Sequence, residues 1–315
     1  MKLTAREVFD KLINDEKILA QEGTIKFFLG SVDIIVKQRD VVGNIMQEWL
    51  EGWLKKNGIE YAVSENSQMP PDFFLDRENH TKDLLEIKAF NSEASPAFDI
   101  ADFRMYAEEI KDKPYMLDVD YLIFSYHMSA DGIVTIKDVW LKKVWEITRR
   151  MEKFPLNLQV KNNVIHKIRP GVWYSTRVKD YSIFESMEDF VSALEETTFK
   201  DSRTKGMAPT WLSDFSRNYR DWYGKKIVIP RWHEIEDKYD NTQRNKIARL
   251  KKEKVALEEK CAKQQNALEE LQAKLETAAT EAQKKKITYQ IEKKSEQLGT
   301  LKEQMEKYAV RTDEF

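Results

Sequence analysis

The strongest constraint on the fold of this chain is an abrupt change in composition near residue 237. All eight tryptophans and all eight prolines lie before this point, whereas residues 238–315 contain no proline and a single glycine, Gly299. Because proline interrupts helices, its absence permits long continuous helices. The apolar residues there recur at steps of three, four or seven, as in a coiled coil: Ile247, Leu250, Leu257, Cys261, Leu268, Leu271 and Leu275. We expect a globular domain over residues 1–237 and a helical coiled-coil extension over residues 238–315.

A second apolar series in the extension is out of phase with the first, and the change of phase falls near residues 277–286. Its members are Ile287, Ile291, Leu298, Leu301, Met305 and Tyr308. Two helices folded back as an antiparallel hairpin give such a pattern, and so does one long helix with a local change of winding. We favour the hairpin. It could serve as an arm for packing or dimerisation, or it could touch DNA through the lysines at 251–252 and 284–286.

The overall composition excludes several classes of protein. The chain has 52 Lys+Arg against 54 Asp+Glu, so any binding of nucleic acid must depend on local basic patches. Its one cysteine, Cys261, can form neither an internal disulfide nor a cysteine-built zinc site. No stretch approaches the ~18 consecutive apolar residues of a membrane span, and the first residues lack the apolar block of a signal peptide. We expect a cytoplasmic protein with no membrane partner.

The residues before 237 alternate between helical and strand patterns, which is typical of a mixed α/β domain. A capping box of Thr4 and Glu7 opens a helix that we expect to run to about Ala20. The other expected elements, in chain order, are a hairpin of strands at 24–29 and 32–37, a helix at 41–56, strands at 60–63, 72–75 and 84–90, a helix at 99–111, strands at 119–126, 134–141, 158–161 and 164–168, and a helix at 186–196.

The residues that bear on chemistry are Asp72, which follows two prolines, and the pair Glu86 and Lys88. In a strand, Glu86 and Lys88 share one face, while Leu85 and Ile87 face the opposite way into a core. If the strands at 72–75 and 84–90 form a hairpin, Asp72 and Glu86 converge. Two carboxylates about 5 Å apart repel by roughly 3 kcal/mol at an effective dielectric of 20, which a bound cation relieves. The alternative is a Pro-Asp turn beside an exposed Glu/Lys pair.

Hard oxygen ligands of this kind favour Mg²⁺. Such an ion lowers the pKa of a bound water and stabilises charge on a phosphoryl oxygen. Lys88 would then orient or deprotonate the attacking water and offset negative charge in the transition state.

This arrangement resembles the active-site motif of the PD-(D/E)XK nuclease superfamily. The match is Pro71-Asp72, thirteen intervening residues, and Glu86-Ile87-Lys88, and the expected element order agrees with the αβββαβ core of that superfamily. The resemblance implies a mixed central sheet flanked by helices, with Mg²⁺ bound by Asp72 and Glu86. It also implies a further acid from the helix before the first strand, and we favour Glu48 over Glu51 for this place.

Longer runs, such as VVGNIMQEWLEGWL, MPPDFFLD and LLEIKAFN, resemble type II restriction endonucleases of the NgoBV/NlaIV-like group over roughly residues 1–235. The resemblance implies a site-specific deoxyribonuclease that cuts both strands of double-stranded DNA, with GGNNCC as the implied target. A palindromic target calls for a homodimer, and a cognate DNA methyltransferase would protect the host. Two alternatives remain, a non-catalytic coiled-coil assembly or DNA-binding protein and a structure-specific repair nuclease.

Double-stranded DNA requires Lys and Arg for its phosphates and side chains that reach its base edges. Two stretches within residues 158–232 offer both. The candidate residues are Lys161, Lys167, Arg169 and Arg177 in the first stretch and Arg203, Lys205, Arg217 and Arg220 in the second. The alternative for each stretch is a solvated basic face with its aromatic residues in the core.

Overall fold

The computed structural model describes residues 1–66 and 69–313. The chain divides into two compact units, one formed by residues 1–177 and 181–240 and the other by residues 178–180 and those from 241 onward. None of the helices in the described ranges is both long enough and apolar enough to span a bilayer.

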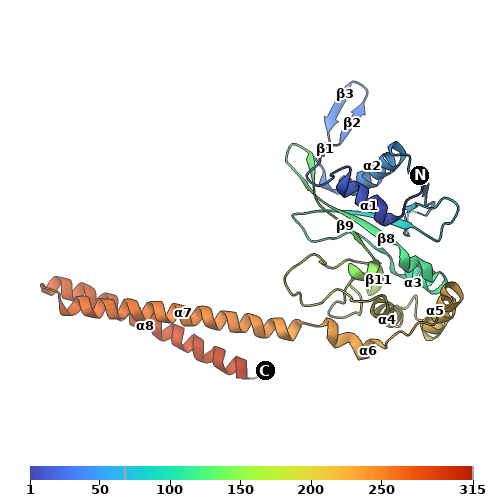
Figure 1. The fold of residues 1–315 in the computed structure, drawn as a ribbon. Coiled ribbons are helices and arrows are strands. Elements are labelled where there is room, and N and C mark those ends of the chain that lie inside the picture. The colour runs from blue at the N-terminus through green and yellow to red at the C-terminus, as the bar shows by residue number, and fades with distance from the viewer. Residues whose placement is uncertain (67–68, 314–315) are drawn as a thin grey trace. The chain divides into compact units, whose positions relative to one another are not determined.

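The first unit is a mixed α/β fold around one large sheet (Figure 1). In chain order its main helices and strands are α1 (Ala5–Asn14), β1 (Glu22–Thr24), β2 (Lys26–Leu29), β3 (Val32–Ile35), α2 (Val42–Lys56), β4 (Ala62–Val63), β5 (Phe73–Phe74), β6 (Leu84–Asn91), β7 (Ala101–Asp102), α3 (Phe103–Asp112), β8 (Asp120–Met128), β9 (Ile133–Lys142), β10 (Leu158–Lys161), β11 (Val164–Ile168), α4 (Met187–Thr198), α5 (Ala208–Tyr223) and α6 (Trp232–Ile235). Apart from the two-residue strand β7, which pairs in another sheet, the elements α2, β4, β5, β6, α3 and β8 follow the αβββαβ order expected from the sequence.

The large sheet has the strand order β1-β9-β8-β6-β5-β4. Its two central strands, β6 and β8, are parallel, and all its other pairs are antiparallel. The crossover between β6 and β8 contains α3, which is the connection that parallel neighbours require. The expected mixed central sheet flanked by helices is therefore confirmed.

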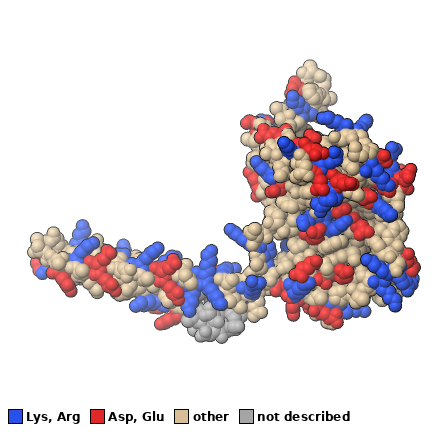
Figure 2. All heavy atoms as spheres, in the orientation of Figure 1, with Lys and Arg blue, Asp and Glu red and all other residues tan. Residues whose placement is uncertain are grey.

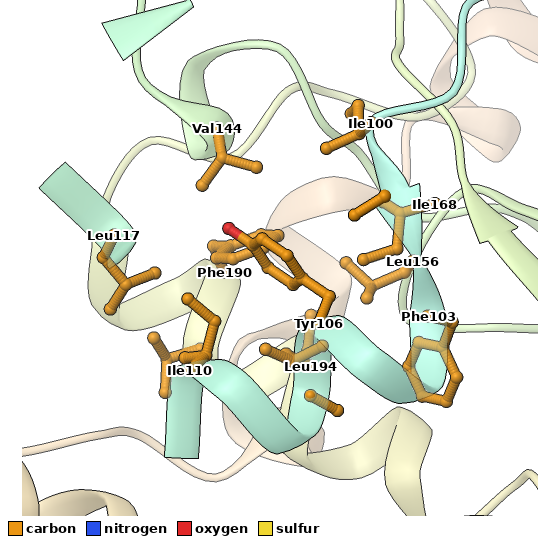
Figure 3. Close-up of a cluster of buried hydrophobic side chains, with 14 of the residues drawn as sticks. Ile100, Phe103, Tyr106, Ile110, Leu117, Val144, Leu156, Ile168, Phe190 and Leu194 are labelled. Carbon is orange, nitrogen blue, oxygen red and sulfur yellow. The ribbon is translucent and has the colours of Figure 1, made fainter. Parts of the chain in front are cut away.

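The two faces of β6 belong to different cores, because successive side chains of a strand point to opposite sides. Leu85 and Ile87 pack with buried residues of α1 and α2, such as Val8 and Leu50. Leu84 and Phe90 belong to the other core, which is formed mainly with helices α3, α4 and α5. Figure 3 shows part of this second core, where the ring of Tyr106 from α3 lies among Val144, Leu117, Phe190 and other apolar side chains.

Four helices differ from those expected from the sequence, and one of them, the short helix α6, was not expected. The first helix keeps its expected capping box at Thr4 but ends at Asn14, because residues 15–20 turn and lead into β1. The helix expected from residue 99 begins at Phe103, because Ala101 and Asp102 pair with β11 and the Asp102 side chain then caps α3. Helix α5 was not expected, although its Trp211 and Phe215 are fully buried at helical spacing.

Strands β2 and β3 form a separate two-stranded hairpin that projects from the sheet in Figure 1. Its register pairs Lys26 with Ile35 and Leu29 with Val32, around the turn at Gly30 and Ser31. Gly30 has a φ of 60°, a left-handed conformation that favours glycine. This hairpin was expected from the sequence.

The second unit consists mainly of two long helices, α7 (Thr242–Glu276) and α8 (Glu281–Asp313), which pack on each other. They are separated by residues 277–280, at the expected change of apolar phase. The buried residues at their contact include Leu250 and Leu268 of α7 and Leu298 of α8, while the outward faces of both helices are mainly polar. The seam also contains a polar pair, since Lys294 Nζ donates to Gln264 Oε1 over 2.9 Å.

Candidate active site

Asp72 reaches the strand that carries Glu86 by a hydrogen bond to the main chain. It directly precedes β5, whose Phe73 is paired with Leu85 of β6. The amide N–H of Ile87 donates to Asp72 Oδ2 over 2.7 Å. Because Ile87 lies between Glu86 and Lys88, this bond places the Asp72 carboxylate at the same point of β6 as the two other candidate residues.

Glu86 and Lys88 lie on the same face of β6 and form an ion pair. Lys88 Nζ is 2.5 Å from Glu86 Oε1, and the Glu86 residue is only 4% exposed. Among the residues that the structure describes, the second oxygen, Glu86 Oε2, is buried with no hydrogen-bond partner. A buried, unpaired carboxylate oxygen is costly, so it marks a position where a ligand can bind.

The site is electrostatically strained because two acids lie close together, Glu86 buried and Asp72 half-buried. Burial raises the pKa of Glu86 to about 7, and the nearby Asp72 charge adds to this, while Lys88 opposes it. Burial also raises the pKa of Asp72, against its hydrogen bond from Ile87 and the Lys88 charge. Burial lowers the pKa of Lys88, but the charges of Glu86 and Asp72 outweigh it, so that this pKa lies above its ordinary value. A cation bound between the acids would favour their ionised forms.

These three side chains open onto one polar cavity of about 330 Å³. Helix α2 contributes Gly43, Asn44 and Gln47 to its wall, and the loop before β7 contributes Asp99. The wall also includes Lys167 of β11, one of the residues expected to bind DNA. The cavity therefore combines the buried acid Glu86, the half-buried acid Asp72, one exposed acid and two lysines.

The further acid expected from α2 does not reach this cavity. Glu48 is exposed and does not belong to the wall, where its neighbour Gln47 lies. The helix turn directs position 47 and not position 48 toward β6. The alternative acid, Glu51, accepts a hydrogen bond of 3.1 Å from the Tyr61 hydroxyl instead. Asp99 was not among the expected site residues, because it stands after β6 in a run whose pattern favoured a helix.

The donor set fits a small hard cation with few protein ligands. Asp72 and Glu86 supply carboxylate oxygens, and the unpaired Glu86 Oε2 is the oxygen that such an ion would take. No cluster of three His, Cys, Asp or Glu side chains in metal-binding geometry occurs within residues 1–66 and 69–313. Mg²⁺ commonly keeps several waters and binds through one or two carboxylates, so two acids suffice.

The residues expected to contact DNA separate into different environments. Lys167 lines the cavity, and Arg169 lies beside it, with its Nε 3.1 Å from Asp99 Oδ1. Arg203 has a structural partner, because its guanidinium pairs with the buried Asp201 at 3.1 Å and also donates to the Ile165 carbonyl oxygen.

The other five candidates are exposed and lie outside the cavity wall. Arg217 pairs with Asp214 at 2.9 Å, and Arg220 approaches Asp221 at 3.4 Å. Lys161, Arg177 and Lys205 are also exposed. These side chains are available on the surface but are not brought to the site formed by Asp72 and Glu86.

The mixed central sheet flanked by helices is consistent with a PD-(D/E)XK nuclease core, and Asp72, Glu86 and Lys88 meet at one cavity on it. The chain belongs to the NgoBV restriction endonuclease family, whose model matches residues 2–239. It is 61% identical over 239 residues to the type II restriction enzyme NlaIV of Neisseria lactamica, a match that covers 76% of this chain and 98% of that protein. It is 56% identical over 161 residues to the type II restriction enzyme NgoBV of Neisseria gonorrhoeae, covering 51% of this chain and 91% of that protein.

A solved structure, that of the NlaIV restriction endonuclease, matches with a TM-score of 0.74 and 61% identity, over 76% of this chain and 98% of that one. The chain is therefore a type II restriction endonuclease. Because the family match ends at residue 239, helices α7 and α8 lie outside it.

Proposed function

We propose that this enzyme hydrolyses a phosphodiester bond in each strand of a short palindromic DNA site with Mg²⁺ held by Asp72 and Glu86. The observation that carries the proposal is the buried Glu86 Oε2, which has no partner among the described residues and stands beside Asp72 in a polar cavity. The assignment to a restriction endonuclease family favours this function over a repair nuclease or a non-catalytic assembly protein.

The roles of the residues follow from their positions. Asp72 and Glu86 would hold the ion, which when bound supplies positive charge to the phosphoryl oxygens and acidifies water. Lys88, paired with Glu86 at 2.5 Å, keeps an ammonium group at the cavity, where it orients the attacking water and offsets the charge of the transition state. Lys167 in the wall holds a DNA phosphate close to these groups.

The specificity that we propose is GGNNCC, on the basis of the resemblance to the NgoBV/NlaIV-like group. Cleavage of both strands of a palindrome requires two active sites related by a twofold axis, so the enzyme would act as a homodimer. A methyltransferase that modifies the same site would protect the host genome. It would be a functional partner without physical contact.

The experiment is a digestion of one plasmid of known sequence, with Mg²⁺ and with EDTA, followed by sequencing of the fragment ends. The proposal predicts discrete fragments whose ends all lie within GGNNCC, and intact plasmid in EDTA. Discrete ends at another sequence would reject the target but keep the class of reaction. Cutting that continues in EDTA would reject the metal, and a smear of random ends would reject site-specific cleavage.

A further inference from the structure

The hairpin of β2 and β3 exposes an unusual amount of apolar surface. Six large apolar side chains in ten consecutive residues are between 42% and 71% exposed: Phe27, Phe28, Leu29, Val32, Ile34 and Ile35. They correspond to roughly 600 Å² of apolar surface, the upper end of what a soluble monomer normally presents in one patch. Figure 2 shows the end of the hairpin as mostly uncharged surface.

This hairpin lacks the support that a two-stranded sheet needs. Every residue of β2 and β3 is exposed, on both faces, so the described part of the unit leaves both faces largely uncovered, although Ile35 at the base lies close to Gly132. An isolated two-stranded hairpin is at best marginally stable in water, and it needs further strands or a packed face. Among the described residues, β2 and β3 pair as strands only with each other, so their outer edges present main-chain groups that a partner strand can pair.

An apolar groove adjoins the base of the hairpin. It has a volume of about 230 Å³ and lies between β1 and α2. Its wall includes Ile25, directly before β2, and the α2 side chains Ile45, Met46 and Trp49. Ile45 is 39% exposed, so the apolar surface continues from the hairpin onto the body of the unit. Together the two surfaces approach the ~800 Å² that each partner contributes to a standard interface.

The charges on this surface favour protein over DNA. Residues 26–35 contain one cation, Lys26, and one anion, Asp33, so the hairpin has no net charge, and the charged residues in the groove wall, Glu16 and Glu22, are acids. A surface that binds double-stranded DNA needs several cations for the phosphates. An uncharged apolar patch of this size instead matches a second copy of itself, because a twofold interface brings identical patches together.

We propose, building on the cleavage of both strands proposed above, that the β2–β3 hairpin and the adjoining groove form the interface between two copies of this chain. The two hairpins cover each other's apolar side chains around the twofold axis or enter the partner's groove. The same surface then sets the spacing of the two active sites on the palindrome, because α2 lines both the groove and the catalytic cavity.

The test measures the oligomeric state of the full chain by sedimentation equilibrium without DNA or metal. The variant Phe28→Lys/Leu29→Lys places charges on the patch, and Ile34→Lys does so on the other strand. Val228→Lys is the matched control, since Val228 is 84% exposed in the same unit but outside the hairpin. Circular dichroism melts check folding, which the hairpin variants should retain because these side chains are not in the core.

The wild type and Val228→Lys should sediment as dimers, at about twice the chain mass of 37.2 kDa. Both hairpin variants should be monomers, with the dimer dissociation constant raised at least about 100-fold. Folded hairpin variants that remain dimers, or a wild type that is monomeric, would overturn the interface. So would variants that stay dimeric but lose DNA affinity, because the hairpin would then insert into DNA. Sedimentation does not depend on cleavage. If the wild type does not cut DNA but forms a dimer that the hairpin variants lose, only the proposed function is rejected.

Discussion

Asp72 and Ile87 are joined by a hydrogen bond of 2.7 Å between a side-chain oxygen and a main-chain amide, although fourteen residues separate them in the sequence. The bond uses the amide between the two other site residues. It therefore couples the position of the first acid to β6, the strand that positions Glu86 and Lys88. Any change in the pairing of β5 with β6 would separate the acids and take apart the cavity.

Replacement of Lys88 should slow cleavage strongly while sparing the metal site. Lys88→Ala removes the ammonium 2.5 Å from Glu86 Oε1 and leaves both carboxylates in place. We expect cleavage to slow by about 100-fold or more, as on loss of a group that stabilises charge in a transition state. Single-turnover cleavage and Mg²⁺-dependent thermal shifts measure the two effects separately. Lys82→Ala, an exposed lysine before β6, is the control, and equal rates in the two variants would refute the role of Lys88.

The pH dependence of cleavage should report competition between protons and Mg²⁺ for Glu86. Burial raises the pKa of Glu86 to about 7, and the protonated carboxyl cannot hold a cation. At limiting Mg²⁺ the rate should therefore rise up to about tenfold per pH unit below pH 7 and level off above it. At saturating Mg²⁺ the rise should move to lower pH. Rates measured between pH 5.5 and 8.5 at both concentrations test this, and identical profiles would argue against it.

Lys167 and Arg203 should behave differently although both were expected to bind DNA. Lys167 lines the cavity, so Lys167→Ala should weaken DNA binding and reduce the salt dependence of the association constant by about one ion. Arg203 pairs with the buried Asp201, so Arg203→Ala should cost about 1–3 kcal/mol of folding free energy. Binding isotherms at several salt concentrations and urea unfolding of each variant separate these effects. The reverse pattern would mean that Arg203, and not Lys167, meets the phosphates.

A chain ending at residue 240 should still cut DNA specifically. Residues 1–177 and 181–240 form one compact unit, and the family match lies within residues 2–239. The proposed dimer surface lies in the same unit, so the shortened chain should cleave with the same specificity and within about threefold of the full rate. Digestion of one plasmid by both chains provides the comparison. Loss of double-strand cutting by a folded, shortened chain would assign dimerisation to α7 and α8.

Local signals in the sequence were sufficient for most of the fold. The capping box at Thr4 located the start of α1, and the alternation around Glu86 correctly placed Leu85 and Ile87 in a core. The ends of helices were less predictable. Residues 101–102 are helix-compatible by composition, but they pair with β11, a strand more than sixty positions away.

The site was predictable where it depended on one strand and its neighbour, and less so where it depended on distant elements. Side chains two positions apart in a strand share a face, which places Glu86 beside Lys88. In contrast, only the packing of α2 on β6 decides that Gln47, and not Glu48, lines the cavity. The basic residues were harder still. Arg203 is bound to Asp201, two residues away, and to Ile165 in a distant strand, so its charge alone suggested a surface role that its contacts do not support.

The most direct test of the account compares Asp72→Asn with the control Asp83→Asn in Mg²⁺-dependent plasmid cleavage. The Asp72→Asn side chain would keep an oxygen to accept the Ile87 hydrogen bond but lose the charge that holds the cation. An asparagine also tolerates the left-handed conformation of Asp83, which has a φ of 50°. We predict that Asp72→Asn folds, loses the Mg²⁺-induced thermal shift and cuts at least about 100-fold more slowly, while Asp83→Asn matches the wild type. Wild-type cleavage rates and Mg²⁺ response in folded Asp72→Asn would contradict the metal site on which the account depends.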